Sequence, residues 1–146
     1  MNKTEIRQHG FTLIEIMVVM VILGLLVAIV APNILGRGEE ARLQVAKTQI
    51  SQVSSALDLY KLDNFNYPST EQGLEALVNK PSGFPEPKNW NKNGYMKNVP
   101  VDPWNNPYQY ISPGVNGPFD LYSWGPDGRE GGEGDDADIG NWALDK

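Results

Sequence analysis

Six carboxylates lie within the twelve residues from Asp127 to Asp138 and form the densest group of potential ligands in the chain. Four glycines and one cation, Arg129, are interleaved with them. Carboxylate and carbonyl oxygens on a flexible backbone suit Ca²⁺, which takes about six to eight oxygen ligands. The spacing departs from an EF-hand, because Arg129 and Gly131 stand where ligands belong. From the residues alone, a cation site and a solvated acidic loop both remain open. The six are Asp127, Glu130, Glu133, Asp135, Asp136 and Asp138.

A second candidate functional residue is Glu15. It is the only charged residue in an apolar segment that runs from residue 11 to residue 35. A carboxylate inside such a segment costs about 2.5–3.5 kcal/mol on insertion scales, so we expect it to have a partner. The alternative is a local role in the first turn of a helix, at the level of lipid headgroups, where the helix dipole favours a negative charge.

Composition excludes several classes of function. The chain of 146 residues has no cysteine and a single histidine, His9, and its formal net charge is −6. A disulfide framework and thiol chemistry are therefore excluded, and acid–base catalysis has few of its usual groups. We expect a protein that is not an enzyme. The acidic balance also disfavours nucleic acid as a partner.

The apolar segment 11–35 is long enough to span a bilayer as a helix. Lys3 and Arg7 precede it and Glu39 and Glu40 follow it, so the positive-inside rule places the N-terminus in the cytoplasm. An ordinary signal peptide is the alternative. It fits poorly because the apolar run is too long and begins with a carboxylate.

The next segment predicts an amphipathic helix that ends near Asp63. Apolar residues recur at alternating spacings of three and four, while the opposite face is polar. Pro32 lies between this helix and the apolar segment, where it predicts a kink or a locally unwound stretch. The apolar stripe consists of Leu43, Ala46, Ile50, Val53, Leu57 and Tyr60.

Beyond residue 64 the pattern changes to short elements. Ser69 and Gln72 predict a capping box that begins a short helix. Nine of the eleven prolines lie between Pro81 and Pro126, and the best strand candidates are 108–112 and 119–124. The expected fold class is α+β, with a long N-terminal helix and a small antiparallel sheet. The expected core aromatics are Trp104, Tyr108, Tyr110, Phe119, Tyr122 and Trp142.

The hexapeptide Gly10-Phe11-Thr12-Leu13-Ile14-Glu15, after a short basic leader, resembles the start of type IV prepilins and pseudopilins. The resemblance implies cleavage between Gly10 and Phe11 by a prepilin peptidase, followed by N-methylation of Phe11. It further implies that Glu15 pairs with the N-terminus of a neighbouring subunit during assembly.

Four downstream stretches extend the resemblance over nearly the whole chain, to the major pseudopilins of type II secretion systems. The match departs from the family at Asn105, where glycine is usual, and at Trp124, where leucine is more frequent. Asparagine tolerates left-handed backbone geometry, so the first departure is mild. The stretches are Tyr67 to Leu74, Asp102 to Tyr108, Ser123 to Gly128 and Asp136 to Trp142.

The resemblance implies a type IV pilin-like fold with one structural calcium in the acidic loop. The ligands would come from Asp127, Asp135, Asp136 and Asp138 and from the backbone carbonyl of Trp124. The implied divisions are a leader (1–10), a transmembrane and filament-core helix (11–35), its amphipathic continuation (36–63) and a periplasmic α+β region (64–146).

The function implied by the resemblance is that of a filament subunit. The protein would wait as a single-pass protein of the bacterial inner membrane, polymerise with itself into a periplasmic pseudopilus and drive the export of folded proteins. Minor pseudopilins and the inner-membrane assembly platform would be its other partners. An adhesive type IV pilin, a minor pseudopilin and a single-pass periplasmic calcium-binding enzyme or module are the alternatives.

Overall fold

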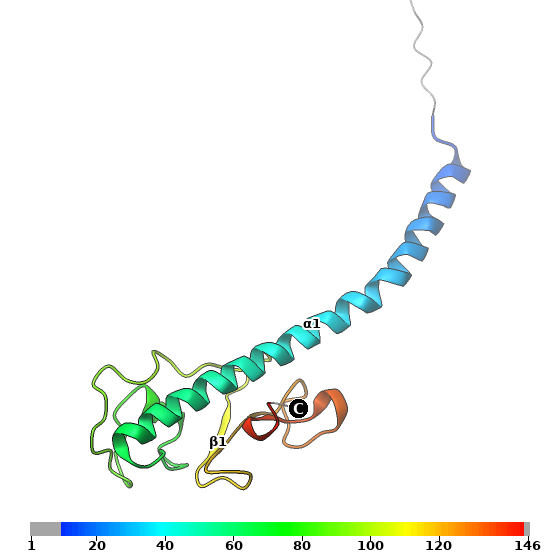
Figure 1. The fold of residues 1–146 in the computed structure, drawn as a ribbon. Helices are drawn as coiled ribbons and strands as arrows, with labels where there is room; N and C mark the ends of the chain where they lie inside the picture. The colour runs from blue at the N-terminus through cyan, green and yellow to red at the C-terminus, as the bar shows by residue number, and fades with distance from the viewer. Residues whose placement is uncertain (1–9, 145–146) are drawn as a thin grey trace, which may run out of the picture. The chain divides into compact units, whose positions relative to one another are not determined.

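The computed structural model describes residues 10–144, with side chains for 10–29 and 38–144. One long helix comes first, and short elements follow it (Figure 1). The predicted leader 1–10 therefore lies outside the described residues except for Gly10. The elements are α1 (Leu13–Asn64), the 3₁₀ helix η1 (Leu74–Leu77), β1 (Gln109–Ile111), β2 (Asp120–Ser123), the 3₁₀ helix η2 (Gly134–Asp136), β3 (Ile139–Gly140) and the 3₁₀ helix η3 (Asn141–Ala143).

The chain forms two compact units that meet in sequence at Glu39 and Glu40. The first unit contains the N-terminal part of α1, and every side chain described between Phe11 and Ile29 is exposed. No helix meets the length and apolarity needed to cross a membrane when the residues with described side chains are considered. The predicted span 11–35 extends over residues 30–35, whose side chains lie outside that description.

The helix α1 continues through Pro32 without interruption. Of the two outcomes predicted for this proline, local unwinding is therefore not found. A proline removes only one backbone donor from the helical ladder, and the bonds on either side of it can hold the turn. The 52 residues of α1 join both predicted helical segments in one element.

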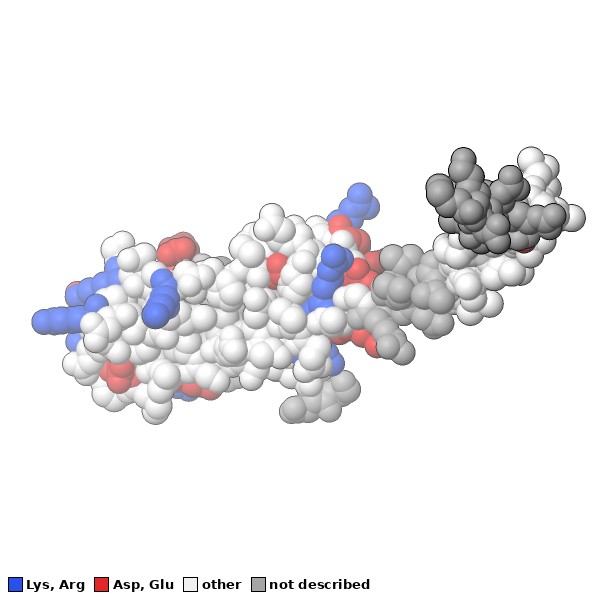
Figure 2. All heavy atoms as spheres, turned by 90° about the horizontal axis from the view of Figure 1, so that it is seen from above, with Lys and Arg blue, Asp and Glu red and all other residues white. Residues whose placement is uncertain are grey.

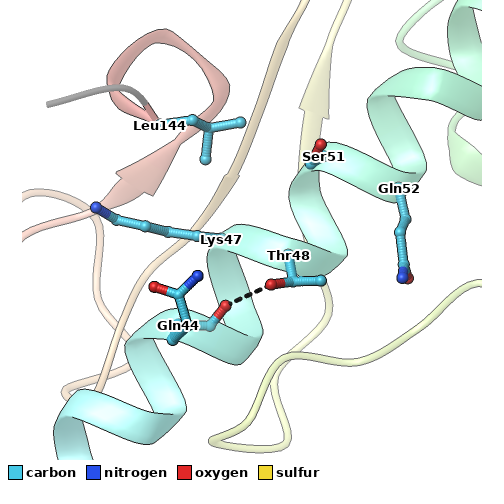
Figure 3. A pocket seen from close by; sticks show the side chains of 6 residues that line it. All are labelled: Gln44, Lys47, Thr48, Ser51, Gln52 and Leu144. Atoms are coloured by element: carbon cyan, nitrogen blue, oxygen red, sulfur yellow. Dashed lines mark hydrogen bonds between the residues drawn. The ribbon is translucent and has the colours of Figure 1, made fainter.

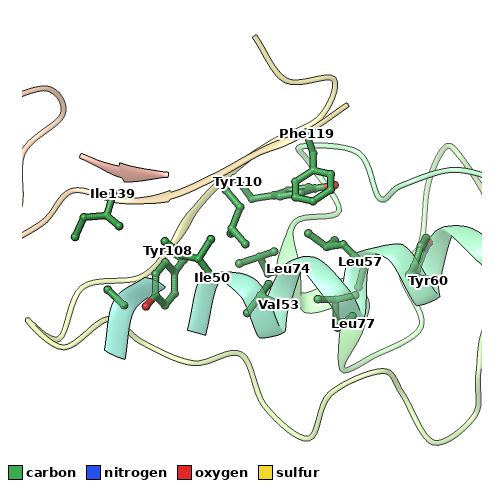
Figure 4. Close-up of a cluster of buried hydrophobic side chains, with 14 residues drawn as sticks. Ile50, Val53, Leu57, Tyr60, Leu74, Leu77, Tyr108, Tyr110, Phe119 and Ile139 are labelled. Carbon is green, nitrogen blue, oxygen red and sulfur yellow. The ribbon is translucent and has the colours of Figure 1, made fainter. Parts of the chain in front are cut away.

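In the second unit, the apolar stripe of α1 forms one wall of the core. Ile50, Val53 and Leu57 are fully buried, and Tyr60 is 1 % exposed. Their spacing of three and four residues places them on one helical face, as the sequence predicts. Figure 4 shows these side chains facing Tyr108, Tyr110 and Phe119 from the sheet region and Leu74 and Leu77 from η1.

The opposite wall is an antiparallel sheet with the strand order β1-β2-β3. Tyr110 pairs with Leu121 between the first two strands, and Ser123 pairs with Ile139 between the last two. Both strand predictions, 108–112 and 119–124, are confirmed with narrower bounds.

The predicted capping box is present just before η1. The backbone N–H of Ser69 donates to Gln72 Oε1 at 3.0 Å, and the N–H of Gln72 donates to Ser69 Oγ at 3.2 Å. The side-chain amide of Gln72 also donates to the carbonyl of Pro85 at 3.0 Å. The box therefore fixes both the turn before η1 and the loop that follows it, although the helix is a 3₁₀ helix of four residues.

The prediction for Trp142 is wrong, because its side chain remains 40 % exposed. Its ring covers Gly140, where an added Cβ would approach the indole to 2.4 Å, and it lies 5.6 Å from the Tyr122 ring. Trp142 lies in η3, after the last strand, and within the described residues none of the three residues of this 3₁₀ helix is buried. Tyr108, Tyr110 and Phe119 are buried as predicted, whereas Trp104 and Tyr122 are half-buried.

Candidate functional site

The first candidate site is the start of α1, where Thr12 and Glu15 form a reciprocal cap. The backbone N–H of Thr12 donates to Glu15 Oε2 at 2.9 Å, and the N–H of Glu15 donates to Thr12 Oγ1 at 3.3 Å. The hydroxyl of Thr12 also donates to Glu15 Oε2 at 3.1 Å. The Thr-x-x-Glu spacing in the sequence is the signal for this capping box. The box is not among the sequence-based predictions, which instead expect a partner for Glu15 in another subunit. Glu15 thus has a local role within its own chain.

The predicted cleavage site lies immediately before this cap and is open to solvent. Gly10 is exposed, and a Cβ added there would meet no atom within 4 Å. Phe11 is 82 % exposed. A peptidase would therefore meet no side chain that shields the bond between Gly10 and Phe11 in the described residues.

The second candidate site is the acidic loop, residues 127–138. Asp127 Oδ1 accepts from the N–H of Arg129 at 3.0 Å, and Asp138 Oδ2 accepts from the N–H of Gly131 at 3.0 Å. Asp135 and Asp136 are exposed in η2. Within the described part of the chain, no three acidic, histidine or cysteine side chains are grouped closely enough to hold a metal ion.

Asp138 and the backbone beside it fit a cation better than the other candidates do. Asp138 Oδ1 is buried and has no hydrogen-bond partner. Gly125, with φ +72°, lies close to the chain at 136–137, since its added Cβ would be 3.3 Å from the carbonyl oxygen of Ala137. The turn after Trp124 and the end of the acidic loop are therefore adjacent. A buried carboxylate oxygen without a donor is the kind of group that a bound cation would satisfy.

The base of the acidic loop is tied to the sheet by Asp102, which the sequence analysis named only as the first residue of the stretch from Asp102 to Tyr108. Asp102 is buried, and its Oδ1 accepts from the N–H groups of Trp104 at 3.0 Å and Asn106 at 2.7 Å. Its Oδ2 accepts from Ser123 Oγ at 2.5 Å, and Ser123 Oγ in turn accepts from the N–H of Gly125 at 3.0 Å. The stretches that start at Asp102 and at Ser123 thus meet in space and position the base of the acidic loop.

A shallow groove of about 410 Å³ lies between α1 and the end of the chain. Figure 3 shows Lys47 and Gln44 from α1 on one side and Leu144 on the other. Lys47 is the only charged residue among its lining side chains, so the groove offers no pair of titratable groups for acid–base chemistry. The two sites above remain the candidates.

Comparison with known proteins decides the family. The family model described as "Type II secretion system (T2SS), protein G" matches residues 33–142. The chain belongs to this family. A second model, described as "Prokaryotic N-terminal methylation motif", matches residues 6–31. The resemblance to major pseudopilins predicted from the sequence is thereby confirmed.

Relatives from this family cover almost the full chain. The type II secretion system core protein G of Pseudomonas aeruginosa is 66 % identical over 93 % of this chain and 96 % of its own length. That of Vibrio cholerae is 58 % identical over 94 % of each chain. A crystal structure of the major pseudopilin from the type 2 secretion system of enterohaemorrhagic Escherichia coli matches with a TM-score of 0.68 and 45 % identity, over 76 % of this chain and 95 % of that one. The predicted α+β pilin-like fold is confirmed by this match together with the observed helix and sheet.

Proposed function

We propose that this chain is a major pseudopilin, a structural subunit that polymerises into the periplasmic pseudopilus of a type II secretion system. The membership of the protein G family and the likeness to a solved major pseudopilin support this function. Its work is the export of folded proteins across the outer membrane. Minor pseudopilins, the inner-membrane assembly platform and the prepilin peptidase are its partners.

The observation that carries the proposal is the bare apolar surface of α1 in the first unit. Leu13 is 82 % exposed and Ile29 is 68 % exposed, and the apolar side chains between them are also exposed. A helix that is apolar all round is stable only when something covers it. In a single-pass precursor, lipid covers the segment 11–35. In the filament, the same segments of neighbouring copies cover one another.

Processing prepares the chain to leave the lipid and enter the filament. Cleavage between Gly10 and Phe11 removes Lys3, Arg7 and Glu5, and it creates a new amino terminus at Phe11, which is then N-methylated. The match of the N-terminal methylation motif to residues 6–31 supports this step. Glu15 of one copy then pairs with the positive terminus of the next copy, which offsets the cost of two charges in an apolar core.

A calcium ion in the acidic loop completes the assembly-competent subunit. Asp138, whose Oδ1 is buried without a donor, and the neighbouring backbone support this assignment. Asp127, Asp135, Asp136 and the carbonyl of Trp124 would supply the remaining oxygens. Calcium would hold the loop by neutralising carboxylates that otherwise repel one another.

Reconstitution of the full-length chain with a prepilin peptidase and the assembly components of its own secretion system tests the proposal. We expect sheared surface material to contain thin fibres of the processed chain when it is viewed by electron microscopy. An unprocessed Gly10→Trp chain, expressed equally, serves as the control and should give none. A single-pass enzyme or calcium-binding module would remain monomeric in both samples, and that result would reject the proposed function.

A further inference from the structure

Charge is distributed unevenly along the second unit. From Lys80 to Lys97 there are four lysines and one acidic residue, Glu86, so this segment has a formal charge of +3 (four minus one). The acidic loop has six acidic residues and Arg129, so its formal charge is −5 (one minus six). In Figure 1 the two segments lie at opposite ends of the unit. Figure 2 shows Lys and Arg atoms projecting at one end of the molecule, with Asp and Glu atoms among them. The segment 80–97 is therefore basic and the acidic loop is acidic, although Glu71 and Glu75 line a pocket together with Lys80.

The basic segment carries a groove of about 700 Å³, which we call the lysine groove. Lys80, Phe84, Glu86 and Lys88 are among its lining residues. The Phe84 side chain is 90 % exposed, and Lys88 Nζ lies 5.7 Å from the centre of the Phe65 ring. Lys80 has no hydrogen bond or ion pair within the described residues, although Glu71 and Glu75 line a pocket with it. The groove thus offers lysine ammonium groups beside an uncovered aromatic ring, and the capping residue Gln72 holds its edge through the Pro85 carbonyl.

The carboxylates at the tip of the acidic loop also lack a partner within the described part of the chain. Glu130 and Glu133 are exposed and have neither an ion pair nor a hydrogen bond through their side chains. Cβ atoms added at Gly131 or Gly134 would meet nothing within 4 Å, whereas one added at Gly132 would approach the carbonyl oxygen of Asp136, so the tip is open to solvent beside Glu130 and Glu133 and is packed on its own backbone at Gly132. Neither glutamate is among the residues assigned to calcium. Their charges would therefore remain available when the calcium site is filled.

We propose that the lysine groove binds the acidic-loop tip of a second copy of this chain. This inference rests on the proposed polymerisation and specifies one contact within the filament. Identical subunits that repeat along an axis meet through two different surfaces, and in the second unit α1 runs from the side of the acidic loop to the side of segment 80–97. Copies stacked in the same direction thus present the lysine groove of one to the acidic loop of another. Opposite charges fix the register of such a contact and speed the encounter.

A disulfide trap tests the contact in the full-length chain, because the protein has no cysteine of its own. Glu86→Cys in the lysine groove and Glu133→Cys at the loop tip, placed in one chain, should form disulfide-linked ladders in filaments under mild oxidation. Glu86→Cys combined with Val115→Cys is the matched control, since Val115 is 89 % exposed on another loop. We expect at least about fivefold less cross-linked product for the control. Equal yields would overturn the proposal.

Reversing the charges of the lysine groove and of the loop tip tests whether their attraction contributes to assembly. Lys80→Glu with Lys88→Glu should reduce the assembled fraction by about threefold or more, because two surface pairs become repulsive. Glu130→Lys with Glu133→Lys in the same chain should restore it. Parent chains that make no filaments would reject the proposed function itself. Parent filaments that form while the reversed charges change neither assembly nor cross-linking would reject only this contact. Normal assembly with lost export would assign the groove to another protein and would likewise overturn it.

Discussion

Ser123 Oγ donates a 2.5 Å hydrogen bond to the buried carboxylate of Asp102, and this bond joins β2 to the turn at 102–106. Asp102→Ala would leave that hydroxyl and the N–H groups of Trp104 and Asn106 without an acceptor. Each lost partner costs about 1–3 kcal/mol in a buried site. We expect Asp102→Ala to lower the free energy of unfolding of a fragment from Glu40 onward by about 3 kcal/mol or more, measured by urea denaturation.

Three further variants show how much of that loss of stability comes from the bond between Asp102 and Ser123. Ser123→Ala should cost about 1–2 kcal/mol, and the double variant should cost less than the sum, because the two residues share one bond. Glu71→Ala removes an exposed carboxylate and should change the free energy of unfolding by no more than about 0.5 kcal/mol. Strict additivity of Asp102→Ala and Ser123→Ala would contradict the coupling.

Tyr67 links α1 to the sheet and predicts a loss of stability at alkaline pH. Burial, above all, together with its 2.8 Å hydrogen bond to Asp58 and the charge of that carboxylate, raises the pKa of Tyr67 to about 12. The folded state therefore favours the neutral phenol. Its contribution to stability is complete below the unfolded pKa of about 10 and is lost as pH rises from about 10 to about 12.

Absorbance titration of tyrosinate, compared with a Tyr67→Phe variant, should isolate this group. Asp58→Asn keeps an acceptor but removes the charge, so we expect the pKa of Tyr67 to fall only part of the way. A complete return to the ordinary value would show that Asp58, rather than burial, is the dominant cause.

Processing should depend on the small residue at position 10. In cells with a prepilin peptidase, the mass of the purified parent should correspond to a chain that begins at N-methylated Phe11. Gly10→Trp should remain full length, because a bulky side chain obstructs access to the backbone. Gly24→Ala should be processed like the parent. A mature terminus near Ala31 would instead indicate ordinary signal-peptide cleavage.

The two roles of Glu15 can be separated by one pair of variants. Glu15→Ala removes both the cap on Thr12 and the charge, whereas Glu15→Gln keeps a side chain able to cap the helix. If the charge pairs with a neighbouring terminus, both variants should be processed and inserted but should yield several-fold fewer filaments. Normal filament yield from Glu15→Gln would assign the residue to helix capping alone.

Calcium should raise the melting temperature of the fragment from Glu40 onward. An ion that binds only the folded state at a hundredfold excess over its Kd stabilises by about 2.7 kcal/mol. Chelation should remove this gain, and calcium should restore it better than magnesium, which resists dehydration.

Asp138→Asn and Asp127→Ala should each weaken or abolish the response to calcium, while Glu133→Gln, outside the assigned ligands, should retain it. Thermal melts that are identical in calcium and in chelator would leave residues 127–138 as a solvated acidic loop.

Local patterns were sufficient to predict most of the fold. The stripe from Ala46 to Tyr60 depends only on helical periodicity, and the box at Ser69 and Gln72 depends only on a spacing of three residues. Such signals lie within one element, so no knowledge of the tertiary structure is needed. The bounds of η1 and of the strands are less exact because their last hydrogen bonds depend on neighbouring elements.

The parts that could not be predicted arise from contacts between distant segments. The tie from Asp102 to Ser123 spans 21 residues, and only the register of the folded sheet brings the two side chains together. The exposure of Trp142 likewise depends on what lies beyond the last strand, which composition does not reveal. In the acidic loop, the sequence identified the carboxylates, but the buried position of Asp138 Oδ1 required the fold.

The short strands of the sheet limit how copies of this chain could associate through their sheet edges. Open edges of sheets recruit other strands and lead to amyloid-like aggregation. Here the edge strands β1 and β3 have only three and two residues, and Pro113 follows β1 closely. Neither edge can template a long ladder. Short edges disfavour β-aggregation, so the proposed polymerisation would proceed through the helices rather than through the edges of the sheet.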